Sequence, residues 1–276
     1  MREKLEALWL PGHTRARYPF VWSHHADGTP ASVFTMEKIH ARHSYRWFRP
    51  VHEELMYIGE GAERAVRVDG IVLHHYPDLA KPRGQYLPLL ELSVAENPSD
   101  DRAAFWLGRE YFYNQRHDEC VATLTKYLSL PSARWNEERS AAMRLIARCH
   151  QAKGDRTEAF TWLMRAVAEC PDTREPYLAL VEFGYREQNW PLVYAMVKKG
   201  LGVEHPSGSY LVEAKSWGAA LDDYGAISAH HLGLQDEALA HARRACELAG
   251  NDQRLKANLA FFERIAAKSE GGGEQP

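Results

Sequence analysis

The stretch DRAAFWLGREYFYNQRHDECVATLTKYLSLP, from Asp101 to Pro131, decides the fold. Its apolar residues recur at helical spacing in two blocks, which are separated by a short polar segment and closed by a proline. In such blocks small residues let paired helices approach, and large residues fill the space between neighbouring pairs. The pattern therefore predicts a helix pair. Its key positions are Leu107, Gly108 and Tyr111 on the first helix and Cys120, Leu124 and Tyr127 on the second.

The same spacing recurs downstream as an irregular internal repeat. A shift of 39 residues brings a second copy into register, with Pro171 one place late, and two weaker copies follow. This arrangement resembles the tetratricopeptide repeat, which implies a solenoid of stacked helix pairs. The second copy has Ile146, Ala147, His150, Ala159, Leu163 and Ala166. The third has Leu180, Val181, Gly184, Val193, Val197 and Gly200, and the fourth has Gly225, Ala226, Ala229, Ala238, Ala242 and Ala245.

Polar joints support this register. The segments KGD (Lys153–Asp155), QNWP (Gln188–Pro191) and LGLQD (Leu232–Asp236) each fall between the two helices of a pair. We therefore expect a mainly α protein with about four helix pairs and one preceding helix over residues 84–268. The Gly-rich, charged tail 269–276 is predicted to be flexible.

Residues 1–83 have a different pattern, which is typical of strands. The segments YPFVWSHH (Tyr18–His25) and SVFTMEKI (Ser32–Ile39) are rich in aromatic and β-branched residues and flank an Asp27-Gly28 turn signal. They predict a β-hairpin. The segment AVRVDGIVLHHY (Ala65–Tyr76) predicts either one more strand or two short strands around a turn at Asp69-Gly70.

Composition and charge disfavour several functional classes. The chain has 276 residues, 45% apolar and 26% charged, and 34 basic against 37 acidic residues give a net charge of −3. No basic excess favours nucleic acid, and no apolar run is long enough to span a bilayer. The four cysteines lack zinc-site spacing and are predicted to be small core residues. Together with a charged amino end that lacks a signal-peptide core, these features favour a cytoplasmic protein.

The segment RWFRPVHEEL, from Arg46 to Leu55, is the densest group of candidate functional residues. A zinc-protease helix would need a second histidine four residues after His52, but that position is Met56. Two interpretations remain open. His52 and nearby carboxylates could hold a divalent cation together with other segments, or His52 could be a half-buried structural residue followed by a helix.

Local sequence also suggests a conformation for this segment. Pro50 favours an extended Arg49, so His52 should follow a loop. Glu53 and Glu54 suit the first turn of a helix, which we expect to continue through Leu55 and Met56. One of the two preceding aromatic side chains, Trp47 and Phe48, is expected to be buried and to fix the direction of His52.

The string RWFRPVHEEL, the strand ending HHYPD and the array opening with YLPLLELSVAENPSDDRAAFWLGREYFY together resemble the carboxyl-terminal portion of bacterial family 2 glycosyltransferases. These enzymes carry tetratricopeptide-like repeats behind a GT-A-type catalytic domain. The resemblance implies a nucleotide-sugar donor, a glycan or protein acceptor, and Mn²⁺ or Mg²⁺ in the complete enzyme. It implies His52 as a metal ligand with His75 as the substitute, Glu53 as the catalytic base, and Arg46 and Trp47 as substrate contacts.

The sequence departs from that family in its donor site. The Asp-x-Asp motif that anchors the metal is absent, because Asp100-Asp101 and Asp222-Asp223 are adjacent pairs within the helical array. Residues 1–83 would then be the distal part of a catalytic domain. This part could be truncated, could be a relic that lost the donor half, or could be completed by a donor half from another chain. We expect no sugar transfer by this chain alone.

The alternative is a non-catalytic module whose repeats bind a protein or peptide. Seven aromatic residues in the array could anchor such a ligand, or they could fill the core. They are Trp106, Tyr111, Tyr113, Trp135, Trp162, Trp190 and Trp217.

Overall fold

The computed structural model describes residues 2–51, 53–78, 84 and 86–271. The chain forms two compact units. The first unit is Met1–Arg134 together with Gly208–Tyr210, and the second is Trp135–Ser207 together with Leu211–Pro276. Each unit is described below by itself, and the expected domain boundary near residue 84 stays a prediction.

The predicted β-hairpin is present in the first unit, after the short helix α1 (Arg2–Leu8). Strands β1 (Arg15–His24) and β2 (Pro30–His40) pair antiparallel. At the turn Gly28 has φ +83°, and the Asp27 side chain accepts a hydrogen bond of 2.9 Å from the Thr29 backbone N–H. This geometry is the reason for the Asp-Gly signal, since an Asx-type turn needs a residue that tolerates positive φ.

The segment from Ala65 to Tyr76 forms two short strands rather than one longer strand, which confirms the second of the two predicted alternatives. Strands β5 (Ala65–Arg67) and β6 (Leu73–His74) both pair parallel with β1. Buried residues on one side of this sheet form a small core, in which Ala16, Tyr18, Val68 and Ile71 are packed together. The sheet therefore depends on contacts between segments that lie about fifty residues apart in the sequence.

The predicted helix through Leu55 and Met56 is wrong. Strand β3 (Tyr45–Phe48) pairs antiparallel with β4 (Glu54–Tyr57), so that Phe48 lies opposite Glu54. Arg49 is not extended, because its φ is +70° and its guanidinium contacts Asp100 at 2.9 Å and Glu54 at 2.5 Å. These ion pairs and the strand pairing outweigh the local preferences of Pro50 and the glutamates.

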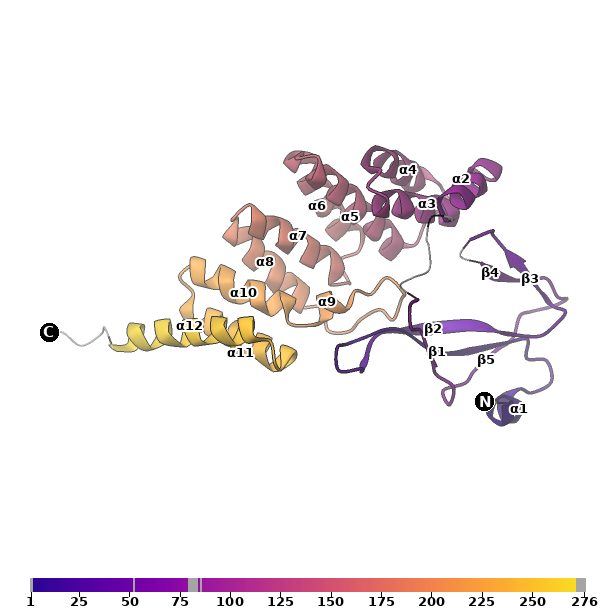
Figure 1. Ribbon diagram of the computed structural model, residues 1–276, viewed down its shortest axis with the longest axis horizontal. Coiled ribbons are helices and arrows are strands. Elements are labelled where there is room, and N and C mark those ends of the chain that lie inside the picture. Colours follow the sequence, from indigo (N-terminus) through magenta and orange to yellow (C-terminus); the bar gives the residue numbers. More distant parts are fainter. Residues whose placement is uncertain (1, 52, 79–83, 85, 272–276) are drawn as a thin grey trace. The chain divides into compact units, whose positions relative to one another are not determined.

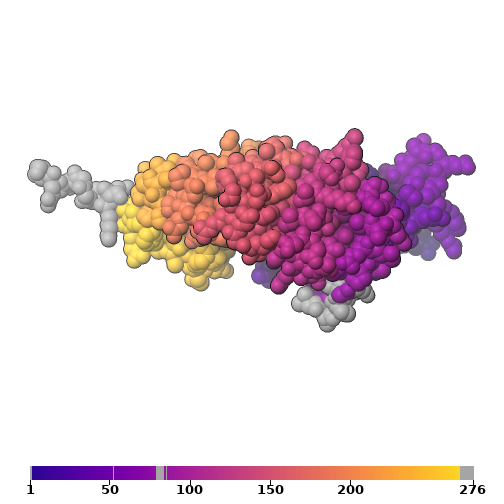
Figure 2. Space-filling model, turned by 90° about the horizontal axis from the view of Figure 1, so that it is seen from above, coloured from indigo at the N-terminus to yellow at the C-terminus, as the bar shows by residue number. Residues whose placement is uncertain are grey.

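The remainder of the described chain is helical, as the repeat predicts (Figure 1). In the first unit α2 precedes the pair α3 and α4. In the second unit α5 to α12 follow one another in sequence order, from red through orange to yellow (Figures 1 and 2). The bounds are α2 Tyr86–Glu96, α3 Asp101–Tyr113, α4 His117–Ser129, α5 Asn136–Ala152, α6 Arg156–Glu169, α7 Glu175–Arg186, α8 Trp190–Leu201, α9 Ala214–Trp217, α10 Ala220–His231, α11 Gln235–Ala249 and α12 Gln253–Gly271.

The repeat positions form the contacts within the helix pairs. Gly108 lies so close to the Leu124 side chain that a Cβ at this position would overlap it. In the fourth pair, a Cβ on Gly225 would lie 3.0 Å from the His241 ring. Small residues are therefore needed where the two helices approach most closely.

The predicted joints are also confirmed, because the Asp155 and Asn189 side chains cap α6 and α8 by accepting backbone N–H groups. The connection between α8 and α9, Gly202–Glu213, is different. It is much longer than the joints within pairs and has no regular structure. None of the helices in the described part of the chain has the length and apolarity needed to cross a bilayer.

Candidate functional site

The first helices of the pairs in the second unit are neighbours. Helix α7 contacts both α5 and α10, and α12 follows α11 at the end of the array. We call the surface formed by α5, α7, α10 and the start of α12 the first-helix face. In solenoids of helix pairs such a face presents side chains that are not required for packing within a pair.

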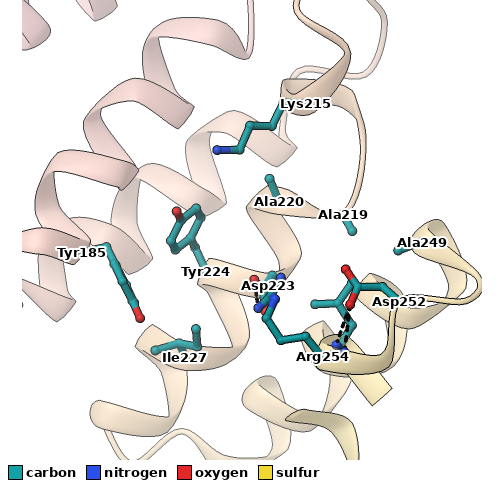
Figure 3. Close-up of a pocket in the computed structure, with 11 residues that line it drawn as sticks. Tyr185, Lys215, Ala219, Ala220, Asp223, Tyr224, Ile227, Ala249, Asp252 and Arg254 are labelled. Carbon is teal, nitrogen blue, oxygen red and sulfur yellow. Dashed lines mark hydrogen bonds and ion pairs between the residues drawn. The ribbon is translucent and has the colours of Figure 1, made fainter. Parts of the chain in front are cut away.

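A pocket of about 350 Å³ lies on the first-helix face (Figure 3). Tyr185 comes from α7, Lys215 from α9 and Tyr224 from α10, while Asp252 and Arg254 come from the start of α12. Small residues such as Ala219, Ala220 and Ala249 complete the lining. The volume is at the lower end of the range of ligand sites and suits one or two side chains of a peptide.

Aromatic and charged groups of this pocket are held by their neighbours. The rings of Tyr185 and Tyr224 meet edge to face, with 5.1 Å between their centroids. The Lys215 ammonium pairs with Glu182 of α7. On the opposite wall Arg254 pairs with Asp223 at 2.8 Å (Figure 3). The pocket therefore offers two aromatic rings and two cations, each of which is already paired with a carboxylate.

The ionisation of these groups follows their surroundings. Burial, with a further contribution from Glu182, raises the pKa of Tyr224, so its hydroxyl stays protonated and can donate a hydrogen bond. Hydrogen bonding to Glu182 raises the pKa of Lys215, and hydrogen bonding to Asp223 raises that of Arg254. The site consequently keeps its charges fixed through the neutral pH range.

Hydrogen bonds at the start of α12 fix the orientation of the charged side chains in the pocket. The Asp252 carboxylate accepts backbone N–H groups of Arg254 at 2.9 Å and Leu255 at 3.3 Å, which starts α12 beside the pocket. Asp223 accepts a second hydrogen bond from the Asn258 amide at 3.2 Å. These contacts position Arg254 and Asp223 before any ligand arrives.

The candidate residues of the first unit lie in a different place. Glu53 is exposed in the connection between β3 and β4. Arg46 and Trp47 are exposed on β3, where Trp47 keeps 51% of its surface accessible. His75 stacks on Trp22 at 4.3 Å, and its Nδ1 lies 3.2 Å from the Trp22 carbonyl oxygen. His52 lies outside the described residues, so its role as a ligand stays a prediction.

The expectation that Trp47 or Phe48 is buried is wrong, since Phe48 also keeps 42% of its surface exposed. Both side chains project from a hairpin that is too short to cover them. Within residues 2–51, 53–78, 84 and 86–271, no group of three or more His, Cys, Asp or Glu side chains is arranged to hold a metal ion.

Sequence reasoning missed the pocket. Asp223 was visible only as half of an adjacent carboxylate pair, and no motif distinguishes Lys215, Tyr224 or Arg254. The aromatic residues are divided: Trp106 and Tyr111 are buried, whereas Tyr113 and Trp135 are exposed at 58% and 37%. Aromatic residues alone could not have located the site.

Comparisons with known proteins identify the fold. No known protein family matches the chain, and no curated protein matches it. Among solved structures it is similar to YrrB, a TPR protein with an unusual peptide-binding site, with TM-score 0.51 and 12% identity over 64% of this chain and 84% of YrrB. It is also similar to MamA, with TM-score 0.46 and 15% identity over 58% of this chain and 79% of MamA. A thermophilic TPR protein of Thermus thermophilus gives TM-score 0.41 and 21% identity over 64% of this chain and 88% of that protein.

The helical part of the chain is therefore a solenoid of tetratricopeptide type, as its repeat predicts. The comparisons lend no support to the resemblance to glycosyltransferases.

Proposed function

We propose that this chain is a non-catalytic binding module that holds a peptide segment of a partner protein on its first-helix face. The observation that carries the proposal is the pocket lined by α7, α9, α10 and the start of α12, where two tyrosine rings in contact share the lining with Lys215 and Arg254. Tyrosine and arginine are the residues that most often dominate the affinity of protein interfaces. YrrB, which shares the fold, is itself described as having a peptide-binding site.

The chemistry of the pocket suits this function better than catalysis. Lys215 and Arg254 are tied to Glu182 and Asp223, so neither is poised to exchange a proton near neutral pH. A peptide can use the same groups without any change of ionisation. An apolar or aromatic side chain would stack against Tyr185 and Tyr224, while backbone carbonyls would accept from the cations.

The test is selection of peptides from a random library displayed against the purified full chain, followed by calorimetry with the selected peptide. We expect Tyr224→Ala and Lys215→Ala to weaken binding about tenfold or more, as central interface residues do. The matched control is Arg165→Ala, an exposed charge on the second helix α6, which should change the affinity less than about twofold. Equal loss in all three variants, or selection of no peptide, would contradict the proposal.

The second candidate is the distal part of a family 2-like glycosyltransferase. It is favoured by the order of sequence features and by the exposure of Arg46, Trp47 and Glu53 around the β3–β4 hairpin. In this case Glu53 would serve as the base, and His52 or His75 would hold Mn²⁺ or Mg²⁺ supplied with a nucleotide sugar.

We expect no sugar transfer by this chain alone, because it lacks the Asp-x-Asp metal anchor. The measurement is turnover of nucleotide sugars by the pure protein with Mn²⁺. Activity that disappears in both His52→Ala and Glu53→Ala would establish the enzyme and displace the binding module.

A further inference from the structure

The connection between α8 and α9, Gly202–Glu213, is a long irregular segment that belongs to the second unit except for Gly208–Tyr210. Its twelve positions contrast with the three-residue joint Lys153–Asp155 between α5 and α6. Long connections without secondary structure are uncommon in compact domains and are usually functional. The insertion leaves the helix pairs on both sides intact, so it is not needed to complete the repeat.

Those parts of the connection that belong to the second unit are bound to the first-helix face. Arg174, at the start of α7, donates to the Val203 carbonyl at 2.9 Å. The Ser207 hydroxyl donates to Glu137 of α5 at 2.8 Å. Near the other end, the Glu213 backbone N–H donates to Glu175 at 3.0 Å. The connection therefore makes polar contacts, of the kind that an extended peptide would make, with α5 and α7.

The strongest of these contacts is an ion pair between Glu213 and Arg144 of α5. The Arg144 side chain is only 7% exposed, and its buried Nε has no hydrogen-bond partner among the described residues. Arg148, one turn further along α5, adds a second positive charge close to the same carboxylate. Burial opposes ionisation of Glu213, but Arg144 and Arg148 outweigh it and hold the pKa of Glu213 below its usual range.

This pair differs from another ion pair on the same helix. Arg139 of α5 pairs with Glu169 of α6 at 2.6 Å, and both side chains are 21% exposed and belong to helices of one pair. Glu213 instead belongs to an irregular connection and keeps 41% of its side chain exposed. Glu213 precedes α9, and its carbonyl accepts the Ser216 backbone N–H at 2.9 Å, so its side chain can leave Arg144 while this helix end is kept. Arg144, by contrast, is fixed in the packed array and needs a carboxylate when Glu213 is absent, because an unpaired buried charge is costly.

The position of Glu213 also links it to the pocket. Lys215, two residues further on, lines the pocket and pairs with Glu182 of α7. Trp217 donates its indole N–H to Glu175 at 2.9 Å, the same carboxylate that holds the Glu213 backbone. Movement of Glu213 away from α5 would therefore alter the wall of the pocket.

We propose that Arg144 and Arg148 form a carboxylate subsite of the first-helix face, that Glu213 fills it as an internal occupant, and that an acidic peptide partner competes with Glu213 for it. This inference rests on the proposed function, which it deepens by naming an acidic peptide as the partner and displacement of Glu213 as the regulation. Charge complementarity selects the partner, since a neutral or basic peptide gives Arg144 no replacement for the carboxylate it loses.

The test uses the full chain and the blocked peptide hexaglutamate, with hexaglutamine as the uncharged control, in calorimetric titrations at low salt. Glu213→Gln removes the competing charge and should raise the affinity for hexaglutamate roughly fivefold, as expected for a partly exposed ion pair. Arg148→Gln should lower it by a similar factor. The matched control Glu169→Gln removes an equivalent carboxylate from the Arg139 pair and should leave the affinity unchanged.

Hydrogen exchange at the Glu213 backbone N–H provides a second readout, which does not depend on any variant. Hexaglutamate should accelerate this exchange if it displaces Glu213 from Glu175 and Arg144. Binding that leaves exchange unchanged, or an affinity that Glu213→Gln does not raise, would overturn the inference. If peptides selected on the Tyr224 pocket still bind in that case, the proposed function stands and only the carboxylate subsite fails. Conversely, displacement by hexaglutamate without any Tyr224-dependent peptide would refute the proposed function alone.

Discussion

In the helix pairs, buried small residues bring two neighbouring helices together, whereas the sheet of the first unit leaves large side chains exposed. Ala159 and Ala238 have no accessible surface, but Trp22 on β1 and Val33 on β2 keep 49% and 45% of theirs. The helix contacts join segments within about forty residues, while Arg15 of β1 pairs with Ala65 of β5. The helices therefore gain their stability from local packing, and the sheet depends on long-range pairing and polar contacts.

Removing a buried apolar side chain tests the helical side of this comparison most strongly. Leu124 is fully buried between α3 and α4, in contact with the position of Gly108. Leu124→Ala should lower the free energy of unfolding by about 2–5 kcal/mol, because it loses burial and leaves a cavity. The measurement is urea unfolding followed by circular dichroism. Trp47→Ala on the exposed hairpin is the control and should change the value by less than about 0.5 kcal/mol.

The ion pair between Arg49 and Asp100 tests the long-range side of the comparison. Their side chains are only 11% and 6% exposed, and Asp100 also accepts the Ala103 backbone N–H at 3.0 Å to cap α3. Asp100→Ala removes both contacts and should cost about 2–4 kcal/mol, measured by urea unfolding. Asp101→Ala, an adjacent carboxylate without the ion pair to Arg49, is the matched control. An equal effect in the two variants would mean that Arg49 does not depend on this partner.

A substitution in the turn between β1 and β2 should lower the free energy of unfolding by a smaller amount. Gly28 has φ +83°, and no atom lies near the position of a Cβ, so the cost of a side chain there comes from the backbone alone. Gly28→Ala should therefore destabilise by about 1–2 kcal/mol. Thermal unfolding measures it, and Gly84→Ala serves as a control at a glycine that also has open space but no positive φ. If both substitutions are neutral, the turn geometry does not determine the stability of the hairpin.

Tyrosine ionisation should distinguish buried from exposed side chains at high pH and should make stability depend on pH only above about pH 10. Burial, reinforced by the hydrogen bond to Glu91, raises the pKa of Tyr111 to about 12. Its neutral form is favoured by folding, so the associated stability is complete below pH 10 and is lost as the pH rises from about 10 towards 12. Burial also raises the pKa of Tyr210 to about 12, so titration of tyrosinate absorbance should show a late step to which both groups contribute, and Tyr111→Phe should remove its share of that step. Tyr113→Phe, which removes an exposed hydroxyl, should leave that late step in place.

The local pattern was sufficient for the hairpin of β1 and β2 and for the helix pairs. Asp27 and Gly28 are residue types that favour a tight turn, so they identify the turn in the sequence as well as form it. At Gly108 and Leu124, helical spacing determines which residues face each other. The same approach gave a helix for Glu53 to Met56, where the structure has a strand. The local helix propensity is overridden there, because Arg49 forms ion pairs with Glu54 and with Asp100, and Asp100 lies about fifty residues away in the sequence.

The pocket could not be predicted, because its lining comes from helices that the sequence separates. Tyr185, Lys215 and Arg254 each occur in an ordinary helical context, and only the packing of α7, α9, α10 and α12 brings them to one surface. Cysteine positions were more informative: Cys120, Cys149 and Cys170 are free and buried as predicted, whereas Cys246 is free and only half-buried.

By itself the sequence determined the helix pairs, because each pair is stabilised by residues that are neighbours along the chain at helical spacing. The tertiary structure alone decided where the connection between α8 and α9 lies. Glu213 is 69 residues from Arg144 in the sequence and has no distinguishing neighbours. Its ion pair exists because the stacked helices bring a buried guanidinium to the surface over which the connection passes, and only the folded array supplies that charge at that place.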